Sequence, residues 1–482
     1  MRPNIGALIA TFLLLSASGC SGGSDSAGDS SNAPPPPPPP PPTGKATLTL
    51  TAHDIFGAPV ADASVRLLIP SGTGVREIGK LTDADGKLEV VGNFKGGYAV
   101  LVTAPELFGS SFESVHADRL DFAVTLHPAS AVTPGIGALT VTSHSADGRQ
   151  LEFSARLYVI EGRVSAETDF AASNMGRVTV IPCSPDNGND GTTFTADCVE
   201  DAAGIDAAYE GTTLSTTWVE PSPVTDPLSI GLLLDQGASL AATDSGDRRL
   251  LAAKYFQTRL DSHDQVALAA FAADDAGTGD VALLPSKPVT IFPVDAPAFT
   301  TDGRGYFATI DSLASFEGGA SPLHDAVGAL IDFTASVAPS DSRKAVVVLA
   351  SGGVNDCATP ADCQADEDSL RVQSESSGVS IVAVGLSPTS GAIDRKRLGT
   401  WAQSPQGSVF WARDAAQVPT IFGRVPEILD GRHGALDVSV RLESPIAGAF
   451  TSGNTVLGTL KVTLCPWECT DMVSVPFALR VP

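Results

Sequence analysis

An acidic residue followed by small and hydroxyl residues stands directly after an apolar run near the middle of this chain. Residues 228–240 have the sequence LSIGLLLDQGASL, so Asp235 is the first charged residue after the run, and Ser239 follows four positions later. Ser321 lies in a second loop of small residues, GGASPL. A carboxylate and hydroxyls are the hard oxygen ligands that Mg²⁺ prefers. The spacing therefore indicates a ligand or cation site that includes Asp235, Ser239 and Ser321.

Alternating strand and helix patterns are expected to position these side chains. Apolar runs predict strands over residues 228–235, 264–273, 288–293, 344–350, 379–386 and 407–412. Amphipathic stretches predict helices over residues 248–260, 304–316, 324–337 and 415–428. This alternation predicts a doubly wound α/β domain over residues 227–430. Because open α/β sheets bind ligands beyond the carboxyl ends of their strands, the loops after these strands are expected to form one site.

These motifs resemble the von Willebrand factor A family, whose Rossmann-like domains are binding modules. The resemblance rests on LLLDQGAS, on Thr243-Asp244 before the first helix, and on GGASPLHDA at residues 318–326. It implies a metal-ion-dependent adhesion site, with the pattern Asp-x-Ser-x-Ser plus a distant Thr and a distant Asp. Carried onto this chain, the metal residues are Asp235, Ser239 and Ser321. The implied cofactor is Mg²⁺ or another divalent cation, and the implied partner is a protein or a cell-surface ligand.

The chain departs from this pattern at three positions. Gly237 replaces the middle serine, Ser351 replaces the second aspartate, and Ser321 stands where threonine is usual. One ligand oxygen and one negative charge are lost, so we expect a partly degenerate ion site. Asp356 restores a carboxylate only if its loop folds back towards the site. In the alternative interpretation, Asp235 and Ser239 only cap the following loop and helix.

The first twenty residues resemble a bacterial lipoprotein signal. Arg2 supplies the positive charge, residues 5–15 are apolar but too short to span a bilayer, and Ala17-Ser18-Gly19-Cys20 resembles a lipobox. The resemblance implies lipidation at Cys20 and contact with a membrane only through that anchor. Ser21 after the cysteine favours the outer membrane, with either periplasmic or surface exposure. An ordinary cleaved signal with a free Cys20 is the alternative.

Composition supports an anchored protein outside the cytoplasm. Residues 21–44 are rich in Ser and Gly and end in the proline run 34–42, which predicts a disordered segment with a stiff spacer of about 28 Å at ~3.1 Å per residue. The formal charge is -25, with 55 acidic and 30 basic residues. This charge argues against binding to nucleic acid.

Cysteine spacing also indicates an oxidising compartment. Apart from Cys20, the cysteines form three close pairs, for which we expect local disulfides. The expected pairs are Cys183–Cys198, Cys357–Cys363 and Cys465–Cys469. None of them has CxxC spacing or a neighbouring histidine, so metal binding by these cysteines is the weaker interpretation.

Two further regions are predicted to be β-rich. In residues 45–130, the sequences GAPVADASV, TDADG and GGY resemble the carboxypeptidase regulatory-like family, which implies a small β-sandwich with a spacer role. There Asp83 and Asp85 are expected to form a hairpin turn and not a calcium site. Residues 136–225 form a second β-rich domain, and residues 434–482 a C-terminal β segment. One hypothesis is that these two segments form one sandwich into which the α/β domain is inserted.

A loop inside the first cysteine pair, DNGNDG at residues 186–191, partly matches a calcium loop. Its third position is Gly188, which has no side-chain ligand, so a polar turn is the favoured interpretation.

Three classes of function follow from these patterns. The favoured one is an envelope-anchored interaction or adhesion module, and the second is a structural envelope protein whose A domain has lost its ligand. An enzyme, for instance a hydrolase, is not expected because the seven histidines are scattered and neither HExxH nor GxSxG occurs.

Overall fold

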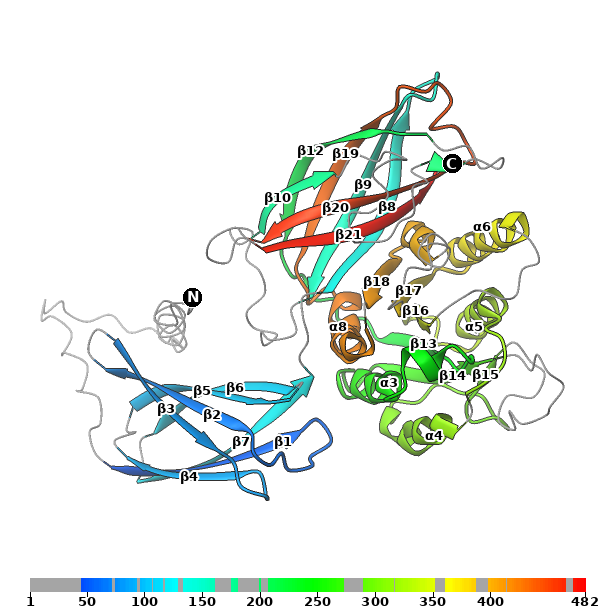
Figure 1. Ribbon diagram of the computed structural model, residues 1–482. Coiled ribbons are helices and arrows are strands. Elements are labelled where there is room, and N and C mark those ends of the chain that lie inside the picture. The colour runs from blue at the N-terminus through cyan, green and yellow to red at the C-terminus, as the bar shows by residue number, and fades with distance from the viewer. Residues whose placement is uncertain are drawn as a thin grey trace, which may run out of the picture. The chain divides into compact units, whose positions relative to one another are not determined.

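The computed structural model is shown in Figure 1. It describes residues 45–71, 74–92, 96–105, 107–115, 118–128, 133–160, 175–180, 199–200, 207–272, 289–315, 317–351, 360–386, 398–412, 414–464 and 471–482. The expected signal, Cys20, the stalk at 21–44 and the DNGNDG loop lie outside these residues. The chain divides into two compact units, Met1–Ala129 and Ser130–Pro482, and each is described by itself.

The first unit consists of two β layers around one apolar core. Its strands are β1 (Ala46–Asp54), β2 (Ser64–Ser71), β3 (Gly74–Leu81), β4 (Lys87–Gly92), β5 (Gly96–Ala104), β6 (Leu107–Val115) and β7 (Arg119–Pro128). The strands pair in the order β3-β2-β5-β6-β7-β1-β4. β3, β2, β5 and β6 form one layer and β7, β1 and β4 the other, and the two layers are joined where Leu107 and Phe108 of β6 pair with Pro128 and His127 of β7. Inward residues of both layers, such as Leu50 and Val100, share the core, as expected for a sandwich.

The turn before β4 agrees with its expected structural role. Asp83 Oδ1 accepts hydrogen bonds from the N–H groups of Asp85 at 3.0 Å and Lys87 at 2.8 Å. These bonds satisfy backbone N–H groups of the turn, which is the hairpin role expected of Asp83.

The second unit contains the α/β sheet that the apolar runs predict. Its strands are β13 (Leu228–Asp235), β14 (Gln265–Phe271), β15 (Thr290–Ile291), β16 (Arg343–Ala350), β17 (Val379–Leu386) and β18 (Ser408–Ala412). Their order in space is β15-β14-β13-β16-β17-β18, and all are parallel except β15. Numbered along the chain, this is the doubly wound order 3-2-1-4-5-6.

Helices cover both faces of this sheet (Figure 1). They are α2 (Leu240–Thr243), α3 (Arg248–Thr258), α4 (Phe307–Ser312), α5 (Leu323–Val337), α6 (Pro360–Ser377) and α8 (Val418–Leu429). Short 3₁₀ turns flank them at Gly303–Tyr306, Leu313–Ser315, Trp401–Gln403 and Ala415–Gln417. α3, α4 and α8 pack on the face that carries Leu232 and Val347, and α5 and α6 pack on the face that carries Leu233 and Val348. The helix α6 is absent from the sequence-based prediction.

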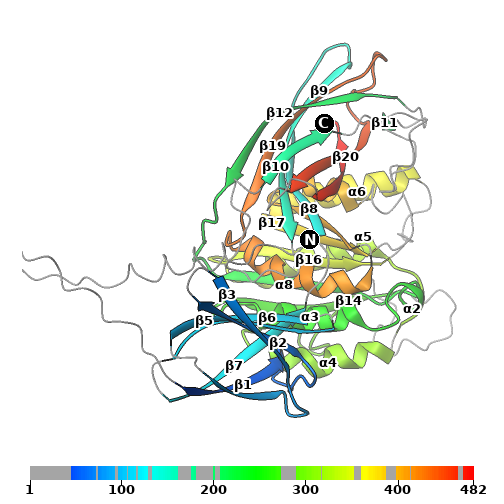
Figure 2. The same cartoon turned by 60° about the vertical axis from the view of Figure 1, so that its left-hand side comes forward.

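Strands from before and after the α/β part pair with one another, as the insertion hypothesis requires. They are β8 (Thr133–His144), β9 (Gln150–Ile160), β10 (Met175–Val180), β11 (Val199–Glu200), β12 (Glu210–Val219), β19 (Ala435–Glu443), β20 (Thr455–Leu464) and β21 (Asp471–Arg480). β19 lies between β9 and β12, and β20 pairs with β10, β11 and β21. The described strands of residues 136–225 and 434–482 therefore form one β region (Figure 2).

One sheet runs through both parts of the second unit. β8 pairs antiparallel with β18, which joins the β region to the parallel strands in one 10-stranded sheet. The close approach depends on glycine, because a Cβ at Gly135 would lie 2.2 Å from the Phe410 ring. None of the helices in the described ranges is both long enough and apolar enough to cross a bilayer.

Candidate functional site

The three predicted site residues lie together at the carboxyl edge of the α/β sheet. Asp235 ends β13, Ser351 follows its neighbour β16, and Ser321 lies just before α5. The loops of Asp235 and Ser321 are joined by backbone hydrogen bonds, from Ala238 N–H to the Gly319 carbonyl at 3.0 Å and from Gly318 N–H to the Gln236 carbonyl at 2.9 Å. In the strand order 3-2-1-4-5-6, the order reverses between the neighbouring strands β13 and β16, and their carboxyl ends mark the topological switch point.

Asp235 is the centre of this cluster. Its side chain is buried, at 1% exposure. Its Oδ1 accepts hydrogen bonds from the Gly237 N–H at 2.7 Å and from the Ser321 hydroxyl at 3.0 Å. Its Oδ2 accepts from the Ser351 N–H at 2.9 Å and from the Ser351 hydroxyl at 3.2 Å. Each carboxylate oxygen therefore has two donors.

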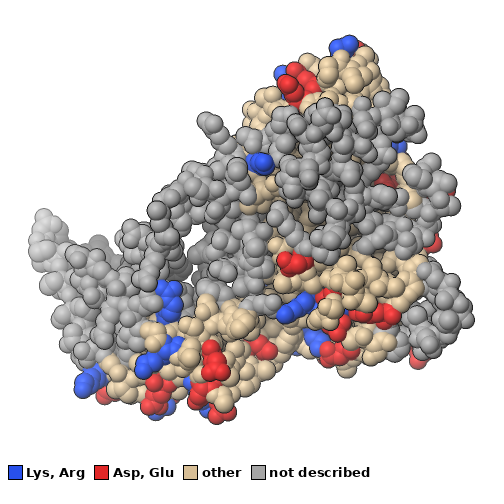
Figure 3. Space-filling view, viewed as in Figure 1, with Lys and Arg blue, Asp and Glu red and all other residues tan. Residues whose placement is uncertain are grey.

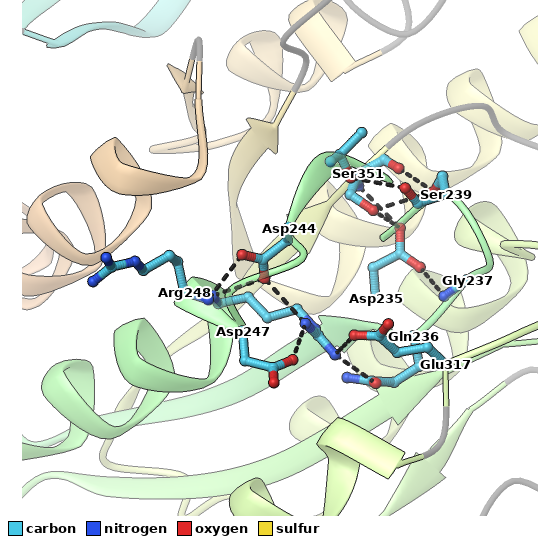
Figure 4. A network of polar contacts seen from close by, with 11 residues as sticks. Asp235, Gln236, Gly237, Ser239, Asp244, Asp247, Arg248, Glu317 and Ser351 are labelled. Atoms are coloured by element: carbon cyan, nitrogen blue, oxygen red, sulfur yellow. Dashed lines mark hydrogen bonds and ion pairs between the residues drawn. The ribbon is translucent and has the colours of Figure 1, made fainter. Parts of the chain in front are cut away.

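Ser239 joins the cluster through Ser351 and not through Asp235. Its hydroxyl donates to the Ser351 carbonyl, and its Oγ lies 3.3 Å from the Ser351 Oγ. Figure 4 shows Asp235, Ser239 and Ser351 facing one another above β13. Ser351, the residue that breaks the expected acidic pattern, is thus a central member of the cluster.

Gly237 is required by the position of Ser321. A Cβ at residue 237 would lie 2.2 Å from Ser321 Oγ and 3.1 Å from Asp235 Oδ1. The Ser321 hydroxyl occupies the space that a side chain at 237 would need. The loss of the middle serine and the bond from Ser321 to Asp235 are two parts of one arrangement.

Burial raises the pKa of Asp235 above its ordinary value, and the hydrogen bonds from Gly237, Ser351 and Ser321 act in the opposite direction. Desolvation disfavours the charged form, whereas donors favour it.

These residues do not fit a resident divalent cation. The cluster holds one carboxylate against a charge of +2, and both of its oxygens already accept two hydrogen bonds. The place of the missing serine ligand is filled by Ser321 Oγ. Magnesium prefers near-octahedral oxygen sites with carboxylates, and a single carboxylate with hydroxyls compensates its charge poorly.

A buried ion-pair network lies beside the cluster, and the sequence-based prediction missed it. Arg249 and Asp244 are both fully buried, and their side chains pair at 3.0 Å. Arg249 also pairs with Asp247 at 3.0 Å, donates to the Gln236 side chain at 3.1 Å and contacts Glu317. Figure 4 shows these acceptors converging between α3 and the loop after β13. The guanidinium thereby holds the loop of Asp235 against the loop of Ser321.

A weak signal for this network was present in the sequence. Arg248 and Arg249 stand in the first turn of α3, where basic side chains oppose the helix dipole. Such a placement indicates acidic partners nearby. Asp244 is such a partner for the helix backbone as well. Its carboxylate accepts hydrogen bonds from the N–H groups of Arg248 and Arg249 at 2.8 and 3.0 Å.

A second acidic group lies at the opposite edge of the sheet. Among the described residues, Asp261, Asp264 and Asp430 are the group of acidic, His or Cys side chains close enough together to share a metal ion. Asp430 pairs with Arg343 at 2.7 Å and with Arg432 at 2.8 Å. Asp264 accepts from the Leu228 and Asp261 N–H groups. These contacts give the carboxylates a structural role at the base of the sheet.

The expected cysteine pairs lie mostly outside the described residues, as does Asp356. Of the pairs, Cys363 in α6 is described, and it is disulfide-bonded. The hairpin of β20 and β21, whose register pairs Leu464 with Asp471, brackets the expected Cys465–Cys469 pair.

Charged side chains cover the helical surface near the site as mixed pairs. Figure 3 shows acidic and basic side chains next to one another in the region of α3 and α4. Lys254 of α3 contacts Asp311 of α4. Next to Asp235, in the described loop and short helix that follow β13, Ala238, Ala241 and Ala242 are exposed, small and uncharged.

Comparisons with known proteins give no family. A scan against family models finds no match for this chain, and a search of curated proteins also finds none.

Solved structures with some likeness include three surface or matrix proteins. Proximal thread matrix protein 1 from the mussel byssus, with a zinc-occupied MIDAS motif, is 13% identical, with a TM-score of 0.31 over 42% of this chain and 48% of that one. The pilus adhesin SpaC from Lactobacillus rhamnosus GG is 12% identical, with a TM-score of 0.32 over 71% and 56%. The pilus adhesin RrgA from Streptococcus pneumoniae is 10% identical, with a TM-score of 0.27 over 91% and 83%.

This chain thus spans about half the length of the mussel protein that it matches. At TM-scores of 0.32 or lower we draw neither fold nor function from these likenesses.

Proposed function

We propose that this chain is an envelope-anchored interaction module of the von Willebrand factor A type, and that it binds a protein or cell-surface ligand at the carboxyl edge of its α/β sheet. One observation carries the proposal: the loops of Asp235, Ser321 and Ser351 meet at the switch point between β13 and β16. Doubly wound sheets bind their ligands at that point. The metal-ion-dependent adhesion site of the resembled family is degenerate here.

The anchor is part of the same proposal. Lipidation of Cys20 and the proline-rich stalk would hold the two folded units away from an outer membrane. The measurement is fractionation of cells that express wild type or Cys20→Ser. The wild type should sediment with membranes and the variant should be released. Equal release of both would contradict the anchor.

The binding face is tested with exposed residues at the two edges of the sheet. Ala238 and Ala242 are exposed beside the site, and Ser340 is exposed at the opposite, amino edge. Intact cells that express the full-length protein are treated with a crosslinker, and captured partners are identified for each variant. A238R and A242R should lose a partner that wild type and S340R retain. Equal capture by all four proteins would contradict the assignment of the face.

A non-enzymatic role is likewise proposed. Screening the full chain against generic esterase and peptidase substrates tests it, and turnover that is lost on substitution of Ser239 would overturn it.

A further inference from the structure

The cluster at the switch point connects loops by direct bonds to one carboxylate. Asp235 receives donors from its own loop at Gly237, from the loop before α5 at Ser321, and from the loop after β16 at Ser351. In the resembled family a cation is the common partner of such loops. Here the common partner is the Asp235 side chain, which belongs to the protein itself.

Two of the three departures from the family pattern, Gly237 and Ser351, favour this arrangement. Gly237 leaves room for Ser321 Oγ, which would otherwise meet a Cβ at 2.2 Å. Ser351 is fully buried and donates twice to Asp235. An aspartate at 351 would instead place a second carboxylate against the first, and two buried carboxylates require a cation or a proton between them.

The donors also offset part of the cost of burying the charge. A buried carboxylate without partners is strongly destabilising, whereas one with all its acceptor positions filled is tolerated. Asp235 has four donors within 3.2 Å. The neighbouring Arg249 network fixes Gln236, the next residue along the chain.

We infer that Asp235, Ser321 and Ser351 form a cation-independent latch, which fixes the carboxyl-edge loops by hydrogen bonds in place of a metal ion. Binding at this edge then needs no divalent cation. The inference rests on the contacts of the cluster. It can therefore be tested without any binding partner.

The first test measures metal binding by the full-length protein. Calorimetry with Mg²⁺ and with Mn²⁺ at millimolar concentration should show no saturable binding. A metal ion that bound at 100 times its Kd would add about 2.7 kcal/mol of stability and raise the melting temperature. Because we expect no such binding, the melting temperature should be equal, within about 1 °C, in EDTA and in either metal. Saturable binding that Asp235→Asn abolishes, or a melting temperature that falls in EDTA, would overturn the latch.

The second test removes one donor at a time. Ser321→Ala should lower the melting temperature by about 3 °C, from the loss of one hydrogen bond to a charged group. The shift should be the same in EDTA and in Mg²⁺, and hydrogen exchange at residues 236–239 should become faster. A shift that appears only in Mg²⁺ would show that the serine serves a cation.

The third test restores the family's second acid. Ser351→Asp should be less stable in EDTA than Ser351→Asn, which has nearly the same size without the charge. This matched pair separates repulsion from bulk. Equal stability of the two variants in EDTA would contradict the argument that one carboxylate excludes another.

Discussion

At the scale of single residues, the site depends on Gly237, because the missing side chain leaves space for the Ser321 hydroxyl. Gly237 does not have a positive φ, so its backbone alone does not demand glycine. The requirement comes from Ser321, whose hydroxyl lies where a Cβ would be. The sequence pattern shows only that a serine ligand is missing at position 237. It does not show the contact with Ser321, because the two residues are 84 positions apart (321 − 237).

We expect Gly237→Ala to lower the free energy of unfolding by about 1–3 kcal/mol, the usual cost of overpacking. The added methyl must displace Ser321 from Asp235. Chemical denaturation measures the change, with Ala238→Gly at the exposed neighbouring position as the control. A stability equal to wild type would mean that Ser321 moves aside without cost.

Arg249 carries a second prediction at this scale. Arg249→Met keeps the length of the side chain but leaves buried Asp244 without its cationic partner, so the free energy of unfolding should fall by about 3–5 kcal/mol. Arg371→Met is the matched control, since its pair with Glu375 is exposed and should contribute at most about 1 kcal/mol. Comparable losses in the two variants would show that burial adds nothing to the first pair.

At the scale of elements, apolar runs predicted the strands, while polar helices were harder to detect. β13, β16 and β17 are buried on both faces, so their continuous apolar sequences identify them. The helix α6 was missed because PADCQADEDSLRVQSESS buries few apolar residues. Among its buried positions are Glu367 and Ser374, which a hydrophobic pattern does not reveal. The loops of the site follow from the strand order, which is a property of the whole sheet.

The packing of α3 against α8 carries a pH-dependent prediction. Glu427 of α8 is buried and pairs with Arg259, the C-cap residue of α3, and with Arg424 at 2.7 Å. Burial alone would raise the pKa of Glu427, but Arg424 and Arg259 together hold it below the ordinary value of 4.5. A depressed folded-state pKa contributes stability above pH 4.5, and this contribution is lost as the pH falls through the folded-state pKa.

Glu427→Gln should therefore be less stable than wild type at pH 7, and the difference should shrink below pH 4.5. Unfolding by urea between pH 3 and pH 7 measures it. The control is Glu375→Gln, which alters an exposed pair. A difference between wild type and Glu427→Gln that is constant over this range would contradict the linkage.

At the scale of the whole molecule, an inserted domain is joined to its host by two chain connections. In the second unit, further contacts join the α/β part to the β region. β8 continues the parallel sheet beyond β18. Gln403, in the turn before β18, exchanges two hydrogen bonds with the backbone of Arg480 in β21, at 3.0 and 2.6 Å. The β region and the α/β part thus share a sheet and a core. Both parts lie in one compact unit, Ser130–Pro482.

We expect residues 130–482 to unfold as one cooperative unit in the full-length protein, and the join at Gly135 to control this cooperativity. Gly135→Val would place a side chain into the Phe410 ring, whose nearest atom lies 2.2 Å from a Cβ at that position. Pairing between β8 and β18 should then be lost, at a cost of about 1–3 kcal/mol or more.

In calorimetry, the single wild-type transition of this unit should split or broaden, and proteolysis between the β region and the α/β part should become faster. Gly246→Val is the control, because its nearest neighbour is the Arg248 side chain at 3.9 Å. If Gly135→Val melts in one transition at the wild-type temperature, the shared sheet does not couple the two parts, and the α/β part is an independent domain.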